Sequence, residues 1–267
     1  MRKLFFMDVD GTLLDCKRNV TAISKNTEYA IKQLIKDQHY VVIATGRSKP
    51  ILNEDLKACN PSGLILVNGG YVEFNNKQIE KILFSTSSIT LIENIIKLCG
   101  GVCMYESDDE MVVKKGELVL ITEFIKQWNM PSLKIIEKEP DIENTYKITA
   151  VFDEEDKCRK FESMMKGISD CRKQENINAY DVVPKGINKG KAAEKIIEYL
   201  SFSKEDTYAF GDGINDIDML KSVGRGIAVK NGNTALKEIA DEICDDAIND
   251  GVYKWLVDNH LILPNKL

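Results

Sequence analysis

The chain has 267 residues, of which 43% are apolar and 29% charged, a composition typical of a globular protein with one large or two modest domains. Its net charge is −6, and the basic residues are interspersed with acidic ones, so we expect no nucleic-acid partner. Met1-Arg2-Lys3 leads directly into a short apolar strand, and no apolar run approaches the roughly 18 residues of a membrane span, so we expect a cytoplasmic protein without membrane attachment. Seven cysteines without paired or zinc-type spacing are expected to be reduced thiols.

The first part of the chain predicts alternating strands and helices. The expected elements are a strand at 4–10, an amphipathic helix with Ala30, Ile31, Leu34 and Ile35 on one face, a strand at 39–45, a helix at 49–58 and a strand at 63–67. Such alternation favours a parallel sheet with helices on both faces, and ligands bind such sheets at the carboxyl ends of the strands.

After Asn68-Gly69-Gly70 the pattern changes to an α+β order. The expected elements are a hairpin of 71–74 and 78–84 around Asn75-Asn76, a helix at 87–98, strands at 102–107 and 110–115, a helix at 117–128, strands at 133–138 and 146–152, a helix at 154–166 and a strand at 178–183. We therefore expect residues 84–183 to form an inserted domain with its own sheet.

From Pro184 the alternation of strands and helices resumes. The expected elements are helices at 189–200, 215–221, 233–240 and 251–260 and strands at 207–210, 227–229 and near 243. The predicted fold class is therefore α/β, with a Rossmann-like parallel core of residues 1–83 and 184–267 and an inserted α+β domain of residues 84–183.

Two carboxylates follow the first apolar strand, in Asp8-Val9-Asp10-Gly11-Thr12. On an extended chain, residues two apart point to the same face, so Asp8 and Asp10 could converge on one substrate atom. An Asp-rich turn without chemistry is the alternative interpretation of this pentapeptide alone.

Two other segments carry groups suited to phosphate. Thr45-Gly46-Arg47 ends a predicted strand and offers a hydroxyl and free backbone N–H groups at a helix start, and Lys189 opens a helix where it could reach an anion. Taken singly, an ordinary strand-to-helix turn or a solvated lysine would explain each of them.

A sharper pattern follows the predicted strand at 207–210, where Asp212, Asn215 and Asp216 lie in a glycine-flanked loop before a helix. If these carboxylates share a cleft with Asp8 and Asp10, each like-charge pair at ~4 Å costs about 4 kcal/mol at an effective dielectric of ~20. Some of the group must then be protonated, or a cation must lie among them. Carboxylate oxygens without histidine or cysteine favour Mg²⁺.

These four segments, in this order, resemble the four motifs of the haloacid dehalogenase-like superfamily. More narrowly, they are similar to its Cof-type phosphatases, which carry a large α/β cap between the second and third motifs. Asn68-Gly69-Gly70, Ile227-Ala228-Val229-Lys230-Asn231-Gly232-Asn233 and Asp250-Gly251-Val252 resemble further stretches of that family. The cap matches only in size and placement.

The resemblance implies a Mg²⁺-dependent phosphatase acting on small phosphorylated metabolites. Asp8 would be the nucleophile that forms an aspartyl-phosphate, and Asp10 would protonate the leaving oxygen and then deprotonate the hydrolytic water, which requires a pKa closer to neutral than that of Asp8. The metal would be held by Asp8, the backbone carbonyl of Asp10, and Asp212.

The same resemblance implies how the remaining polar residues act. The expected roles are phosphate binding by Thr45 and Lys189, phosphate contact or loop orientation by Asn215, secondary phosphate contacts by Gly46 and Arg47, and support by Asp216 of a metal-bound water or of Lys189.

The substrate is left open. Relatives with such caps act on sugar phosphates, flavin mononucleotide or pyridoxal phosphate, and the inserted domain would close over the core and supply specificity contacts. Its candidates are Met104, Tyr105, Glu106, Tyr180 and Asp181, for which sheet core and solvent face is the alternative interpretation.

Two other functions fit the same motifs. One is a phosphomutase of the phosphomannomutase type, which would return the phosphoryl group to a sugar hydroxyl. The other is a non-catalytic regulatory module in which Asp8 is phosphorylated as a signal. We expect a monomer or a weak homodimer.

Overall fold

The computed structural model describes residues 1–125, 134–174 and 177–265. Contacts divide the chain into two compact units, each formed by segments that are separate in sequence. The first consists of Met1–Arg47, Leu52–Glu80 and Asn188–Leu267, and the second of Ser48–Ile51 and Lys81–Ile187.

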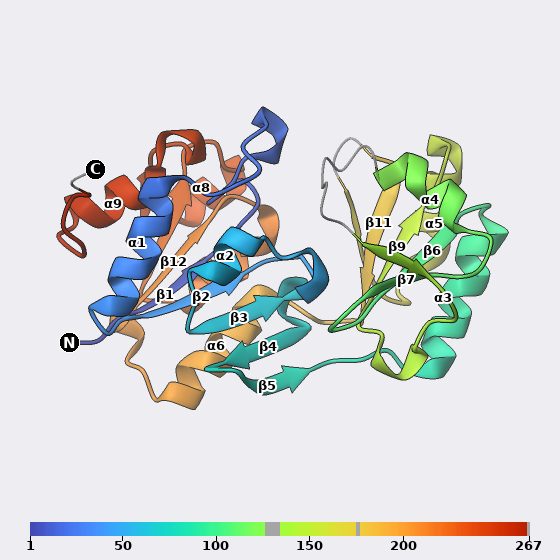
Figure 1. The fold of residues 1–267 in the computed structure, drawn as a ribbon, viewed down its shortest axis with the longest axis horizontal. Helices are drawn as coiled ribbons and strands as arrows, with labels where there is room; N and C mark the ends of the chain where they lie inside the picture. Colours follow the sequence, from blue (N-terminus) through green and yellow to red (C-terminus); the bar gives the residue numbers. More distant parts are fainter. Residues whose placement is uncertain (126–133, 175–176, 266–267) are drawn as a thin grey trace. The chain divides into compact units, whose positions relative to one another are not determined.

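An eight-stranded sheet forms the centre of the first unit (Figure 1). In spatial order its strands are β14 (Glu242–Cys244), β13 (Arg225–Val229), β12 (Thr207–Gly211), β1 (Leu4–Met7), β2 (Tyr40–Ala44), β3 (Gly63–Leu66), β4 (Tyr71–Phe74) and β5 (Lys77–Lys81). All neighbours from β14 to β3 pair in parallel, and β4 is antiparallel to β3. This parallel core confirms the predicted α/β fold class.

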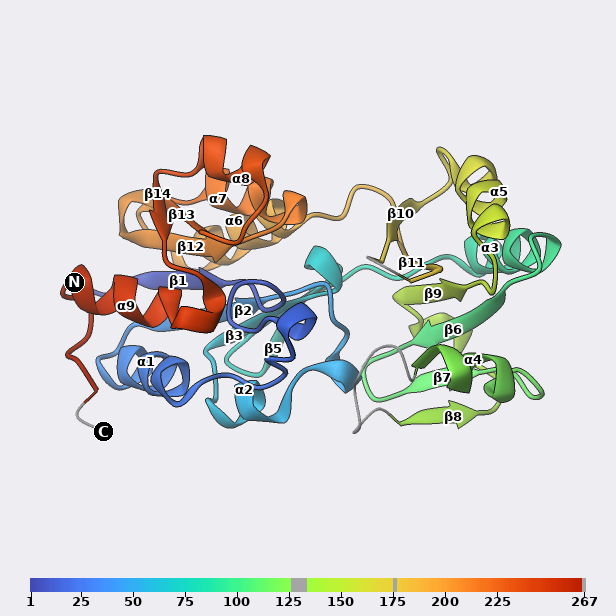
Figure 2. The ribbon, with the colours of Figure 1, turned by 90° about the horizontal axis from the view of Figure 1, so that it is seen from above.

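Helices cover both faces of this sheet, as Figure 2 shows. They are α1 (Lys25–Lys36), α2 (Glu54–Ala58) and α9 (Gly251–Asp258) on one face, and α6 (Lys189–Leu200), α7 (Ile217–Ser222) and α8 (Thr234–Ile239) on the other. On the α6 side, Ala193 and Leu236 belong to the same buried apolar cluster as Phe6. On the α1 side, the ring of Trp255 lies 5.2 Å from that of Phe210.

Strand β1 is shorter than the predicted strand at 4–10, because the chain turns directly after it. The N–H groups of Thr12, Leu13 and Leu14 all donate to the carbonyl of Val9. Asp8 directly follows β1, with its N–H still donating to the carbonyl of Phe210 at 3.0 Å, whereas Asp10 lies where the chain turns away from the sheet.

The predicted helix at 49–58 is divided into a 3₁₀ turn, Lys49–Ile51, and α2. Asn53 interrupts it with extended backbone, and its side chain bonds to Arg47 and to the carbonyl of Thr21. The other 3₁₀ turns among the described residues are Cys16–Arg18, Val67–Gly69, Ile142–Asn144, Lys204–Asp206, Ile214–Asp216 and Ala247–Asn249.

The second unit has its own six-stranded mixed sheet. In spatial order its strands are β10 (Asp170–Lys173), β11 (Ala179–Val183), β9 (Lys147–Val151), β6 (Val102–Glu106), β7 (Met111–Val113) and β8 (Ile135–Glu137), and its helices are α3 (Thr86–Leu98), α4 (Leu118–Ile125) and α5 (Glu155–Met165). Residues 126–128 of the predicted helix at 117–128 and residue 133 of the predicted strand at 133–138 lie outside the described residues.

Strand β10 was not predicted, because Asp170-Cys171-Arg172-Lys173 has only one apolar residue and no alternation. It pairs with β11 at the edge of the second sheet, where backbone pairing does not require an apolar face.

The candidate cap residues lie mainly inside the second unit. Met104, Tyr105, Glu106 and Tyr180 are buried, and Asp181 is partly exposed. All seven cysteines are free. Within residues 1–125, 134–174 and 177–265, none of the helices has the length and apolar character needed to cross a membrane.

Candidate active site

The polar motifs of the first unit meet at the carboxyl edge of its parallel sheet. Met7, the last residue of β1, pairs with Ile43 of β2 on one side and with Phe210 of β12 on the other. The residues that follow these three strands therefore emerge side by side, as expected for ligand sites in α/β sheets.

Three carboxylates from two of these strand ends form a cluster. Asp8, Asp212 and Asp216 each place an oxygen within 4.8 Å of the others. Asp8 and Asp216 are buried and Asp212 is partly exposed. Two segments from opposite halves of the chain, each containing glycine, thus bring negative charge to one point.

Lys189 is the cation within this cluster and is completely buried. Its Nζ donates to Asp8 Oδ1 at 2.5 Å and to Asp216 Oδ1 at 2.6 Å. The side chain of Asn188 caps α6 by accepting from the N–H of Lys191, which makes Lys189 the first residue of the helix. The cap therefore sets where the lysine enters the site.

Asp216 has both of its oxygens engaged by the protein. Besides Lys189, it accepts hydrogen bonds at Oδ2 from the N–H groups of Asp212 (3.1 Å) and Gly213 (2.9 Å). This arrangement holds the Asp212 loop and the lysine together, and it leaves Asp216 less suited to a ligand role than the other two carboxylates.

Burial and crowding shift the pKa values of the cluster. The pKa of Asp8 is raised to about 6, first because burial disfavours its charged form and then because of the charge of Asp216, while Lys189 opposes the rise. The pKa of Asp212 is raised to about 9, by burial first and then by the charges of Asp8 and Asp216. Burial alone would lower the pKa of Lys189, but Asp216 and Asp8 outweigh it and hold that pKa above its usual value.

Asp10 does not join this cluster. Arg47 donates from Nε to Asp10 Oδ2 at 2.8 Å and from Nη2 to Asp10 Oδ1 at 2.6 Å, so both oxygens accept from one guanidinium. The side chain of Arg47 is 8% exposed and that of Asp10 46% exposed. Arg47 also donates to Asn53 Oδ1 at 2.6 Å, which fixes the orientation of the fork.

The other predicted phosphate contacts lie close to these groups. Thr45 is buried after β2, and its Oγ1 accepts from the N–H of Arg47 at 3.1 Å. Asn215 donates from Nδ2 to Asn68 Oδ1 at 3.0 Å, and a Cβ on Gly46 would lie 3.0 Å from Asn68 Nδ2. Asn68 thus links the Thr45-Gly46-Arg47 turn to the Asp212 loop.

The side-chain role of Asn68 was missed from the sequence, as were those of Asn53 and Asn231. A signal existed for Asn68, because it follows β3 just as Thr45 follows β2. Asn231 lies in the stretch 227–233 that resembles the family, but nothing there indicated the role of its side chain, and Asn53 lies in an irregular segment without any such pattern.

The donor set fits a hard divalent cation such as Mg²⁺. Asp8 Oδ2 is buried and has no hydrogen-bond partner, and an unpaired buried carboxylate oxygen is costly. Oxygens from Asp8 and Asp212 are the ligands Mg²⁺ prefers, and a dication would offset the excess of three carboxylates over one lysine.

A family model of haloacid dehalogenase-like hydrolases matches residues 5–256. The chain belongs to this family. The protein is 31% identical over 258 residues to YkrA of Bacillus subtilis (strain 168), covering 94% of this chain and 95% of YkrA. It is also 31% identical over 255 residues to the 5-amino-6-(5-phospho-D-ribitylamino)uracil phosphatase YcsE of the same strain, covering 94% of this chain and 93% of YcsE.

The fold of the chain matches a solved structure across both units. A crystal structure of a protein from Geobacillus kaustophilus HTA426 superimposes with a TM-score of 0.85 at 25% identity, covering 98% of this chain and 100% of that one. The present chain is a phosphatase of the Cof type of this family, and its own second sheet forms the cap domain.

Proposed function

We propose that this haloacid dehalogenase-like hydrolase is a Mg²⁺-dependent phosphatase of small phosphomonoesters in which Asp8 is the nucleophile. The observation that carries the proposal is the Asp8 carboxylate. It is buried beside Lys189, which holds one oxygen, and its other oxygen has no hydrogen-bond partner. A carboxylate held in this way is oriented for attack and is incomplete without a metal or a substrate.

In the proposed reaction an oxygen of Asp8 attacks phosphorus and the bond to the leaving oxygen breaks, so that an aspartyl-phosphate forms. Asp10 gives a proton to the leaving alkoxide, and it then takes a proton from the water that hydrolyses the aspartyl-phosphate. Asp8 and Asp212 would hold Mg²⁺, whose positive charge would stabilise the phosphoryl oxygens in a loose transition state.

Lys189, Thr45 and Asn215 are the proposed phosphate ligands. Lys189 contributes a positive charge whose position is fixed by its bonds to Asp8 and Asp216. The hydroxyl of Thr45 acts as an acceptor toward the N–H of Arg47, which leaves its own O–H hydrogen for donation to the phosphate. Donors fixed before the substrate arrives need no reorganisation during the reaction.

Arg47 is proposed to orient Asp10 rather than the phosphate. Protonation makes an oxygen of Asp10 a weaker acceptor, so one of the two bonds from the guanidinium weakens whenever Asp10 carries the proton. The second bond keeps the acid in position meanwhile.

The proposed substrate is a terminal phosphate on a sugar or ribityl chain. YcsE is named for a phosphoribitylamino compound, and flavin mononucleotide, one of the three substrate types left open by the sequence, carries a phosphate on the same kind of chain. The shared chemistry is a primary phosphate ester next to several hydroxyls.

The test is phosphate release from a panel of sugar phosphates, ribityl phosphates, flavin mononucleotide and pyridoxal phosphate with Mg²⁺. Asp8→Asn should lower kcat by at least ~10³-fold, as loss of a nucleophile does, and chelation of Mg²⁺ should abolish turnover. Asp258→Asn, an exposed carboxylate on α9, is the matched control and should retain activity. Full activity of Asp8→Asn would overturn the proposal, as would isomerised sugar phosphate without free phosphate, or a stable acyl phosphate without turnover.

A further inference from the structure

The segment Lys230–Asn233, which follows β13, contacts both turns that carry the carboxylates. Asn231 donates from Nδ2 to the carbonyl of Gly11 at 2.7 Å, and the N–H of Asn233 donates to the carbonyl of Asp212 at 2.7 Å. The backbone between them is also close, since a Cβ on Gly232 would lie 3.1 Å from Asp212 Cα. One short segment therefore spans the two turns.

The hydrogen bond from Asn231 to the carbonyl of Gly11 lies next to two groups of the proposed metal site. Gly11 follows Asp10, and the position of a Cβ on Gly11 lies 2.0 Å from Asp212 Oδ2. A shift of the Gly11 backbone by a fraction of an ångström would therefore change the space available to the Asp212 carboxylate and the direction of the Asp10 carbonyl.

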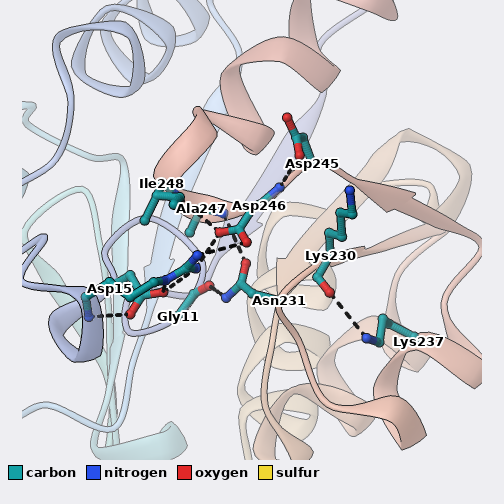
Figure 3. A network of polar contacts seen from close by, with 10 residues as sticks. Gly11, Asp15, Lys230, Asn231, Lys237, Asp245, Asp246, Ala247 and Ile248 are labelled. Carbon is teal, nitrogen blue, oxygen red and sulfur yellow. Dashed lines mark hydrogen bonds and ion pairs between the residues drawn. The ribbon is translucent and has the colours of Figure 1, made fainter.

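The amide of Asn231 is itself held at its other end. Its Oδ1 accepts from the N–H of Ala247 at 3.0 Å, and the side chain of the preceding Asp246 accepts two bonds from Arg18. Arg18 also donates from Nε to Asp15 Oδ2 at 2.6 Å, close to Gly11 in the chain. Figure 3 shows Asn231 between Gly11 and Ala247, with the contact of Lys230 and Lys237 on the opposite side of the segment.

We propose that Asn231 is a positioning residue for the Mg²⁺ site, acting through the carbonyl of Gly11 on the spacing between the Asp8–Asp10 turn and Asp212. The inference rests on the proposed function for its catalytic consequence, and its effect on metal binding is measurable without turnover. The physical basis is that partners behind metal ligands orient them, and their removal typically costs 10–100-fold in affinity or activity.

The test compares Asn231→Ala and Asn231→Leu with Lys237→Ala. Alanine removes both bonds of the amide, and leucine removes them while keeping nearly the same shape. Lys237→Ala is the matched control, because it deletes a bond from the same segment, Nζ to the carbonyl of Lys230, without contact to Gly11. Asn231 is exposed, so the substitutions leave no cavity in the core.

Mg²⁺ affinity is read from the rise in melting temperature with MgCl₂ concentration, and kcat/KM from hydrolysis of p-nitrophenyl phosphate. Both Asn231 variants should lose ~10-fold or more in each, and Lys237→Ala should stay within about 2-fold of the wild type. An Asn231 variant that melts lower but binds Mg²⁺ within about 2-fold of the wild type would overturn the inference.

The two proposals fail in different ways. A wild-type protein that binds Mg²⁺ but releases no phosphate from any substrate would overturn the proposed function alone. Equal Mg²⁺ affinity of the wild type and both Asn231 variants, with normal turnover of the wild type, would overturn only the role of Asn231.

Discussion

Gly11 lies against the carboxylate of Asp212, so closely that a Cβ on Gly11 would be 2.0 Å from Oδ2 and 2.3 Å from Cγ of that residue. The φ of Gly11 is also +98°, a left-handed conformation that other residues rarely adopt. The two residues come from opposite halves of the chain, so glycine here is required by a tertiary contact and by the backbone together.

Gly11→Ala should therefore disrupt the carboxylate site as well as strain the turn. We expect the Mg²⁺-dependent rise in melting temperature to disappear and kcat/KM to fall by about 100-fold, because Asp212 must move. Gly116→Ala is the control, since Gly116 has φ +89° with nothing within 4 Å of its Cβ position. Both variants should lose about 1 kcal/mol of unfolding free energy from backbone strain, measured in urea, and only Gly11→Ala should lose Mg²⁺ binding. Similar Mg²⁺ responses in the two would contradict the role given to this contact.

Arg47→Lys tests whether the guanidinium orients Asp10 or binds the phosphate of the substrate. Lysine keeps the charge but cannot make the paired bonds to Asp10, so we expect kcat to fall by ~10-fold while KM for p-nitrophenyl phosphate changes less than about 2-fold. Arg225→Lys, which alters another paired arginine far along the chain, should leave both constants unchanged. If Arg47 bound the phosphate directly, KM would rise instead, and steady-state kinetics distinguishes the two results.

The stability of the metal-free protein should fall as pH rises, relative to that of Asp212→Asn. In the folded state the pKa values of Asp8 and Asp212 are raised to about 6 and about 9 from 3.8. Between pH 3.8 and its raised pKa, each carboxyl binds more protons in the folded state than in the unfolded state. The free energy of unfolding therefore decreases as pH rises through this range. The amide that Asp212→Asn introduces has no proton to lose, so the difference in melting temperature between variant and wild type should grow from about pH 5 to about pH 9.

Mg²⁺ should reverse this trend in the wild type. The ion binds ionised carboxylates and displaces fewer protons at higher pH, so its stabilising effect should be larger at about pH 8.5 than at about pH 6. Melting curves with and without MgCl₂ measure this directly, and Asp212→Asn should show little response. If the melting temperatures of metal-free wild type and Asp212→Asn changed with pH in parallel, the raised pKa of the buried Asp212 carboxyl would be contradicted.

A comparison of predicted and observed elements shows which strands and helices can be predicted from short-range sequence patterns. The core strands were predicted because each is a short apolar run between turn residues, as in Val41-Val42-Ile43-Ala44, and the parallel α/β class is confirmed. Strand β10 was missed because its polar residues lack a pattern, and the helix predicted at 49–58 is interrupted where the side chain of Asn53 bonds to Arg47 and Thr21 instead of supporting the helix.

The sequence by itself determined which residues follow the strands and in what order, because strand, turn and helix preferences act over a few neighbours. It therefore indicated the family and the carboxylates of the site. Only the tertiary structure decided which carboxylates share a centre: Lys189 joins Asp8 to Asp216, while Asp10 pairs with Arg47. These pairings depend on strand register and on contacts between residues far apart in the chain, and no local preference in the sequence encodes them.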